Sequence, residues 1–260
     1  MSEQDLLWEI RDGIGWITFN RPAARNAMTF AMYDRLVEIC EQAGTDRGIR
    51  ALVLSGAGEK AFASGTDISQ FRAFETEADA LAYEARIDRV LEALERCPRP
   101  TIAAISGACT GGGAGIASAC DLRIAARGAR FGFPVARTLG NCLSMANYAR
   151  LAALLGPALV TEIVFTARLV EADEAKAIGL VSELLEDKPA LLTRAEALAK
   201  LVAGHAPLTL AATKEALRRL RPRVPAGQDK DLILMCYMSR DFREGMEAFL
   251  AKRTPVWQGE

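Results

Sequence analysis

One segment, residues 101–121, limits what this chain can fold into more than any other. A strand-like run from Thr101 to Ser106 leads to three consecutive glycines at positions 111–113, and an alanine-rich, helix-compatible stretch follows at once. Glycines between a buried strand and a helix let the backbone approach another group closely, and the first amides of such a helix have no partner within it. This turn therefore suits an anion, or an oxygen that becomes one during a reaction.

Two other interpretations of the same glycines stay open at this point. Taken alone, they also fit a tight packing turn between a strand and a helix. The run Gly113-x-Gly115-x-x-Ser118 only approximates a dinucleotide-binding fingerprint, because the third glycine is absent and the run lies in the middle of the chain.

A second turn of the same kind occupies residues 60–69. Small residues run through Gly65 into Thr66 and Asp67, where Asp67 is expected to interact with the free amides of a helix start. Two such turns, side by side in parallel β/α units, would offer two backbone N–H groups to one carbonyl oxygen. That arrangement is an oxyanion hole, in which each good donor is worth about 10²–10³ in rate.

The composition indicates a soluble protein of one domain, or one domain with a small appendage. The chain has 260 residues, 50% of them apolar, and a net charge of −1, which gives no strong field to attract nucleic acid or a membrane surface. No apolar run reaches the roughly 20 residues of a membrane span. Six scattered cysteines without a C-x-x-C pair favour a reducing compartment. We therefore predict a cytoplasmic protein.

Alternating strand-like and helix-like segments predict largely parallel β/α units after an N-terminal hairpin around Asp12-Gly13. From about Ala195 onward the pattern is helical throughout. The helices expected there span residues 195–203, 208–220 and 232–252. The apolar stripe of the last one must be covered by the core or by another subunit.

Six segments together resemble the enoyl-CoA hydratase/isomerase family, the crotonase superfamily. The resemblance runs from about residue 5 to 257, and the motifs appear in order. The segments are residues 20–29, 60–68, 100–121, 131–134, 175–181 and 243–255. The resemblance implies an α/β fold, a spiral of ββα units with a helical C-terminal oligomerisation region.

The same resemblance implies a division of the chain and its partners. A spiral core with the acyl-CoA site would span residues 1–195, and a helical trimerisation region would span residues 196–260. The protein would form homotrimers or dimers of trimers. Coenzyme A would enter as part of the thioester substrate, so neither a separate cofactor nor a metal is expected.

The resemblance also assigns residues to the site. The backbone amides of Thr66 and Gly112 would bind the thioester carbonyl and stabilise the enolate that forms from it. Phe249 and Lys252 match tail positions that reach the CoA of a neighbouring subunit. The residues expected along the bound substrate within the core are Ala24, Arg25, Ala63, Gly65, Asp67 and Ile68.

The sequence departs from the family pattern at both catalytic glutamates. Two residues after the third glycine the position is Gly115, and after the Gly-x-Pro of residues 132–134 it is Val135. Adding water across a double bond needs a base on the water and an acid at Cα, and neither side chain can do either. Classical hydratase activity is therefore in question.

The loop after Pro134 departs from the family pattern as well. Its polar side chains would face the acyl group, or else the loop is simply repacked around a pocket of another shape. We expect Cys142 to be a poor nucleophile because no histidine is near it in sequence, and we expect His205 to be an exposed residue at a helix end. The polar candidates of this loop are Arg137, Asn141, Cys142 and Ser144.

Three functions are compatible with these residues. The first is an acyl-CoA enzyme of the family that stabilises a thioester enolate. The second is decarboxylation or C–C cleavage next to the thioester, which makes the enolate without a glutamate base; Arg137 would then orient a substrate carboxylate. The third is a CoA-ester-binding protein with weak or lost catalysis.

Overall fold

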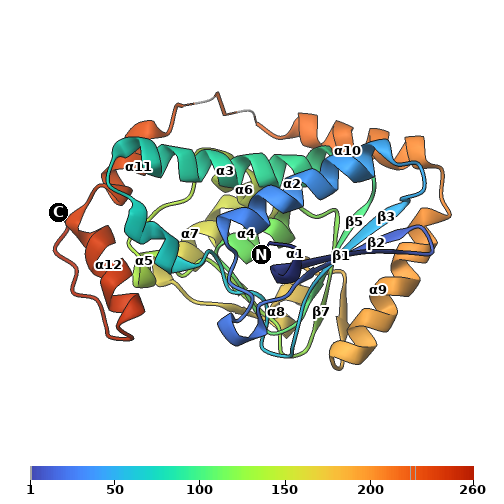
Figure 1. The fold of residues 1–260 in the computed structure, drawn as a ribbon, viewed down its shortest axis with the longest axis horizontal. Coiled ribbons are helices and arrows are strands. Elements are labelled where there is room, and N and C mark those ends of the chain that lie inside the picture. Colours follow the sequence, from blue (N-terminus) through green and yellow to red (C-terminus); the bar gives the residue numbers. More distant parts are fainter. Residues whose placement is uncertain (1, 223, 226) are drawn as a thin grey trace.

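Two sheets organise the fold of this protein, which a computed structural model describes for residues 2–222, 224–225 and 227–260 (Figure 1). The large sheet has the order β1-β2-β3-β5-β7-β10 and the small one the order β4-β6-β8-β9. The strands of the large sheet are β1 (Leu6–Arg11), β2 (Ile14–Phe19), β3 (Ala51–Gly56), β5 (Thr101–Ile105), β7 (Leu122–Ala126) and β10 (Glu183–Leu185). Those of the small sheet are β4 (Ala61–Ala63), β6 (Ala108–Thr110), β8 (Arg130–Gly132) and β9 (Val170–Glu171).

From β3 to β8, consecutive strands alternate between the two sheets, which makes the core a spiral. β3, β5 and β7 pair in parallel in the large sheet, and β4, β6 and β8 pair in parallel in the small one. Each turn of chain adds one strand to each sheet and then a helical segment. These segments are η2 (Ile68–Ala73) with α3 (Glu77–Arg96), α4 (Gly112–Ala119) and α5 (Val135–Thr138). The predicted spiral of ββα units is confirmed.

The large sheet is covered on both faces, because successive side chains of a strand point to opposite sides. Val53 and Ile102 face α9 (Lys188–Ala203), the helix beside the strands at the right of Figure 1. Leu52 and Leu54 face the other side, where α2 (Phe30–Thr45) and α3 contribute to the main core. The predicted boundary between residues 195 and 196 falls inside α9, so this helix packs as part of the core.

The remaining helical segments complete the outer layer. The N-terminal hairpin appears as predicted, with Asp12 and Gly13 both at positive φ between β1 and β2. Among the described residues, no single helix is long and apolar enough to cross a membrane, although the bent pair α6–α7 meets that criterion jointly. The remaining helical segments of the outer layer are α1 (Ser2–Asp5), η1 (Pro22–Ala24), α6 (Met145–Leu155), α7 (Pro157–Thr166), α8 (Ala172–Ala177) and α10 (Pro207–Leu220).

The C-terminal segment differs from the single helix expected over residues 232–252. It forms two helices, α11 (Lys230–Tyr237) and α12 (Arg240–Leu250), because Ser239 is extended and its Oγ accepts a hydrogen bond from the Phe242 amide at 2.9 Å. Phe242 then packs against Phe71 of η2 with ring centroids 5.7 Å apart. The break folds α12 onto the core of the same chain, which covers part of its apolar stripe.

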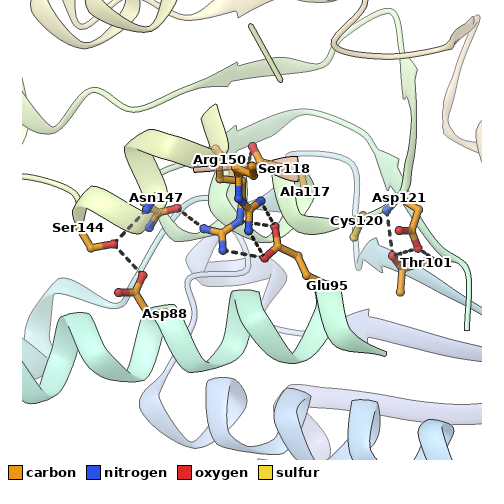
Figure 2. A network of polar contacts seen from close by, with 12 residues as sticks. Asp88, Glu95, Thr101, Ala117, Ser118, Cys120, Asp121, Ser144, Asn147 and Arg150 are labelled. Carbon is orange, nitrogen blue, oxygen red and sulfur yellow. Dashed lines mark hydrogen bonds and ion pairs between the residues drawn. The ribbon is translucent and has the colours of Figure 1, made fainter. Parts of the chain in front are cut away.

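A buried polar network ties α3 to α6 (Figure 2). The Arg150 guanidinium donates to both carboxylate oxygens of Glu95 at 2.7 and 3.0 Å, and Arg221 pairs with the same carboxylate. Arg150 also donates to Asn147 Oδ1 at 3.2 Å, and the Ser144 hydroxyl donates to Asp88 at 2.7 Å. These bonds fix the part of α6 that lies beside α4.

Candidate active site

The two glycine turns meet at the carboxyl ends of β4 and β6, which are neighbours in the small sheet. Gly65 has a φ of +104° and Gly111 a φ of +53°, values that favour glycine. A Cβ atom added to Gly65 would lie 3.8 Å from the Gly112 amide nitrogen. The two turns therefore lie side by side, as the sequence predicted.

The amides of Thr66 and Gly112 are free to bind a ligand. On either side of Thr66, the Met28 amide donates to Gly65 O and the Asp67 amide donates to Met28 O, both at 2.8 Å. Within the described residues, neither Thr66 N nor Gly112 N donates to a protein acceptor. The backbone thus presents two unpartnered donors from adjacent turns, and Gly112 N opens helix α4.

Two buried tyrosines hold this arrangement in place. The hydroxyl of Tyr33 lies 2.9 Å from Thr66 Oγ1, and that of Tyr83 lies 2.7 Å from the same atom. A Cβ atom added to Gly112 would lie only 2.1 Å from the Tyr33 hydroxyl, so that position has room for glycine alone. Sequence reasoning did not assign these tyrosines; both lie on buried faces of helices.

The free amides open onto a cavity of about 730 Å³, large enough for a small-molecule ligand. The cavity is also lined by three exposed cationic residues, Arg25, Arg130 and Lys252, and within the described chain no acidic side chain forms an ion pair with them. Of the substrate-binding residues predicted from sequence, the cavity is lined by Ala24, Arg25, Gly65, Asp67, Ile68, Asn141, Phe249 and Lys252.

Three predicted substrate-binding residues do not line this cavity, and their contact with substrate stays a prediction. Ala63 is fully buried against the first turn of α4. A Cβ atom added to Gly113 in that turn would lie 2.8 Å from the Cβ atom of Ala63. Arg137 is exposed and does not line the cavity. Ser144 is buried under the cavity wall, where it caps α6 by accepting from the Asn147 amide at 3.2 Å.

Two tail residues, Phe249 and Lys252, line the cavity of their own chain. The cause is the break at Ser239, which turns α12 back toward η2 and α5. Figure 1 shows α12 beside α5 at one end of the molecule. The predicted contact of Phe249 and Lys252 with the CoA of a neighbouring subunit stays a prediction.

The sequence profile described as enoyl-CoA hydratase/isomerase matches residues 9–260 of this chain. The chain belongs to this family. Among its relatives is the 2,3-dehydroadipyl-CoA hydratase of Escherichia coli, which is 36% identical over 94% of each chain. The short-chain-enoyl-CoA hydratase of Clostridium acetobutylicum is 31% identical over 97% of each chain.

Solved structures of the family share the fold over nearly the whole chain. An enoyl-CoA hydratase/carnithine racemase from Magnetospirillum magneticum is 34% identical, with a TM-score of 0.79 over 98% of this chain and 96% of its own. A methylmalonyl-CoA decarboxylase in complex with 2-nitronate-propionyl-CoA is 27% identical, with a TM-score of 0.88 over 99% of both chains. The family thus supports an acyl-CoA-binding enzyme.

The two positions at which the family resemblance predicts glutamates, 115 and 135, carry no carboxylate. Gly115 faces the side chain of Leu91, and a Cβ added to it would lie 3.4 Å from Leu91 Cδ1 and 4.0 Å from Asn147 Oδ1. Val135 lines the cavity as an aliphatic side chain. Leu91 and Asn147 therefore border the space next to Gly115 where the first glutamate would project.

Only two described residues of the cavity wall, Asp67 and Glu84, carry carboxyl groups. Asp67 is occupied, because Arg21 pairs with it at 2.9 Å and Ser69 donates to it at 2.7 Å. Burial opposes its ionisation, but these hydrogen bonds outweigh burial and lower the pKa of Asp67. Its role is therefore structural, as the cap of η2.

Glu84 is the residue that sequence reasoning missed. It lies on α3, almost completely buried, and accepts a hydrogen bond from the Tyr237 hydroxyl at 2.5 Å. Burial raises the pKa of Glu84 to about 8. The sequence does contain a sign of this residue, because Glu84 is a carboxylate three residues before Ile87, on the apolar face of an amphipathic helix.

The other side chains considered as nucleophiles or ligands do not form a site. A contact with Cys236 and burial raise the pKa of the Cys142 thiol, which makes it a poor nucleophile. His205 is exposed after α9, as predicted. In the described ranges, no group of three His, Cys, Asp or Glu side chains could hold a metal ion.

Proposed function

We propose that this protein is an acyl-CoA enzyme whose reaction passes through a thioester enolate held by the amides of Thr66 and Gly112. The supporting observation is the pair of unpartnered N–H groups on adjacent turns at the wall of one cavity. Fixed donors aimed at an oxygen that gains charge stabilise the charged state without reorganisation during the reaction.

The geometry supports a separate role for each group of residues around the bound ester. The thioester oxygen accepts from both amides, and these bonds strengthen as the oxygen becomes an enolate. The positive end of the α4 dipole acts in the same direction at Gly112. Arg25, Arg130 and Lys252 at the cavity edge suit the phosphates of CoA, and Tyr33 and Tyr83 hold Thr66 in place.

Hydration by a pair of glutamates is not supported, because positions 115 and 135 are glycine and valine. Two routes to an enolate remain. A proton can shift within an unsaturated acyl group, as in double-bond isomerisation, or a substituent can leave from Cα. Either route needs fewer proton-transfer groups than hydration, which must handle a water molecule and Cα separately.

A second candidate, decarboxylation of a malonyl-type ester, is favoured by two observations. The fold is similar to the methylmalonyl-CoA decarboxylase, with a TM-score of 0.88. The Asn147 amide, oriented by Arg150, lines the cavity as a neutral polar group beside Gly115. Arg137 is exposed and does not line the cavity, so this second candidate is argued without it.

One substrate panel tests the proposal. The purified protein is incubated with crotonyl-CoA, a 3-enoyl-CoA and methylmalonyl-CoA, and each is followed by absorbance or mass. We expect turnover of the 3-enoyl or the methylmalonyl ester and little hydration of crotonyl-CoA. Hydration at the rate of a two-glutamate hydratase would refute the role given to positions 115 and 135. Tight binding without turnover of any ester would indicate a binding protein instead.

Assembly into trimers or hexamers, and a cytoplasmic location, stay predictions. Exposed apolar side chains on α10, including Leu208, Leu217 and Leu220, support assembly because water-exposed leucines gain by being covered. We expect light scattering after size exclusion to give the mass of a trimer or a multiple of it. Substituting Leu208 and Leu220 with glutamate should shift the protein toward a monomer; a wild-type monomer would contradict the proposal.

A further inference from the structure

A buried carboxyl group faces the cavity from a helix that the usual glutamate positions do not use. Glu84 lies in the middle of α3, only 4% exposed, and lines the same cavity as Thr66 and Gly112. Its neighbour Tyr83 bonds to Thr66 Oγ1 at 2.7 Å. The same turn of α3 therefore holds the side chain of Thr66, whose amide is one donor of the oxyanion hole, and supplies a carboxyl group to the cavity.

Hydrogen bonds from the C-terminal part of the chain orient this carboxyl group. Asn141 Nδ2 donates to the Tyr237 hydroxyl at 3.0 Å, and that hydroxyl donates to Glu84 Oε1 at 2.5 Å. Because the Asn141 amide donates, the single phenolic proton is directed at the carboxyl group. Among the described residues, no other side chain hydrogen-bonds to Glu84, and a hydrogen bond from the Ser144 backbone opposes the rise in its pKa.

The surroundings keep this group protonated near neutral pH. Burial raises its pKa to about 8, the Tyr237 hydrogen bond opposes that rise, and the carboxylates of Asp88 and Asp229 add to it. A carboxylic acid that titrates close to neutrality can both give and take a proton, which is the property that general acid–base catalysis requires.

We propose that Glu84 is the catalytic acid–base residue of this cavity, transferring a proton to and from the enolate carbon of a bound acyl-CoA. In the protonation step, the enolate C=C electron pair forms the new Cα–H bond with the carboxylic proton. The C–O⁻ group becomes the thioester carbonyl, and Glu84 is left as a carboxylate. This assignment rests on the proposed function of the site.

The same group fits both routes to the enolate. With a 3-enoyl ester, the Glu84 carboxylate removes a Cα proton and returns it to Cγ, so the double bond moves and the residue is regenerated. With a malonyl-type ester, loss of CO₂ leaves the enolate, Glu84 protonates Cα, and water restores the proton on the carboxylate. One carboxyl group is sufficient in either case.

The test is the Glu84→Gln variant, assayed with the ester that the wild-type protein turns over best. Glutamine is neutral, as Glu84 is near pH 7, and its Oε1 can still accept from Tyr237. We therefore expect unchanged thermal stability and ester affinity, with turnover lowered about 10²–10⁴-fold. The matched control is Glu92→Gln, the same change at an exposed carboxylate of α3 that pairs with Arg96 outside the cavity, which should keep turnover close to wild type.

Outcomes for Glu84 and for the proposed function are distinguishable. Wild-type turnover in a folded Glu84→Gln variant would overturn the role of Glu84 and leave enolate chemistry intact. A wild-type protein that turns over no ester would refute both. Should Glu84→Gln fail to fold, Tyr237→Phe tests the same role: losing the orienting hydrogen bond should lower kcat while KM stays unchanged, and an unchanged kcat would overturn the assignment.

Discussion

Turnover should fall about 10²–10³-fold when the Gly112 amide is removed as a donor, because each donor of an oxyanion hole is worth that much. The variant is Gly112→Pro combined with Tyr33→Phe. Proline lacks the N–H but is tolerated at the first residue of a helix, which Gly112 occupies in α4. Removing the Tyr33 hydroxyl makes room, since a Cβ at position 112 would otherwise lie 2.1 Å from it.

The control for this variant is Gly112→Ala in the same Tyr33→Phe background. It carries the same Cβ and lacks the same hydroxyl, but it keeps the amide proton. Thr66 retains its contact with Tyr83 in both proteins. Steady-state kinetics should show a large loss of kcat for the proline variant only. Equal activity of the two variants would show that the Gly112 amide does not stabilise the transition state.

Substituting Glu95 with alanine should destabilise the fold by about 3–5 kcal/mol, since removing one partner of a buried ion pair leaves an uncompensated charge. Glu95 pairs with Arg150, whose side chain is only 5% exposed, and with Arg221 (Figure 2 shows the Arg150 pair). Urea denaturation at neutral pH measures the loss. The control is Glu186→Ala, which breaks an exposed pair with Arg127 and should have a far smaller effect on stability.

The pH dependence of this effect follows from the same pair. Burial opposes ionisation of Glu95, but hydrogen bonds from Arg221 and Arg150 outweigh it and lower its pKa from 4.5 to about 2. The contribution of the ionised Glu95 to the free energy of unfolding is therefore complete above pH 4.5 and is lost as the pH falls toward 2. The stability difference between wild type and Glu95→Ala should shrink over that range; a constant difference would contradict the role of the ionised pair.

Local chemistry explains what the sequence could predict. Asp12-Gly13 adopts the positive φ values that a tight hairpin needs, and the glycines at 65 and 111–113 allow two turns to touch. These features depend on a few neighbouring residues, so they can be inferred without a structure. The same holds for the missing carboxylates at positions 115 and 135.

Features that depend on long-range packing could not be predicted. The tail reaches the cavity of its own chain because the helix breaks at Ser239, and the continuous apolar stripe of the sequence gives no sign of this break. The position of the Ala63 side chain under α4 depends on how that helix lies over the strand, which the sequence alone does not show. Glu84 was missed because its partner Tyr237 lies 153 residues away.

Deuterium uptake at Cα is the most direct measurement of enolate formation by this protein. A saturated ester such as butyryl-CoA is incubated with the wild-type protein in D₂O above the pKa of Glu84, and its mass is followed over time. If the amides of Thr66 and Gly112 stabilise an enolate, Cα protons will be replaced by deuterium, faster than in buffer and more slowly with the Gly112→Pro, Tyr33→Phe variant. Tight binding of butyryl-CoA without deuterium uptake would contradict enolate chemistry at this site.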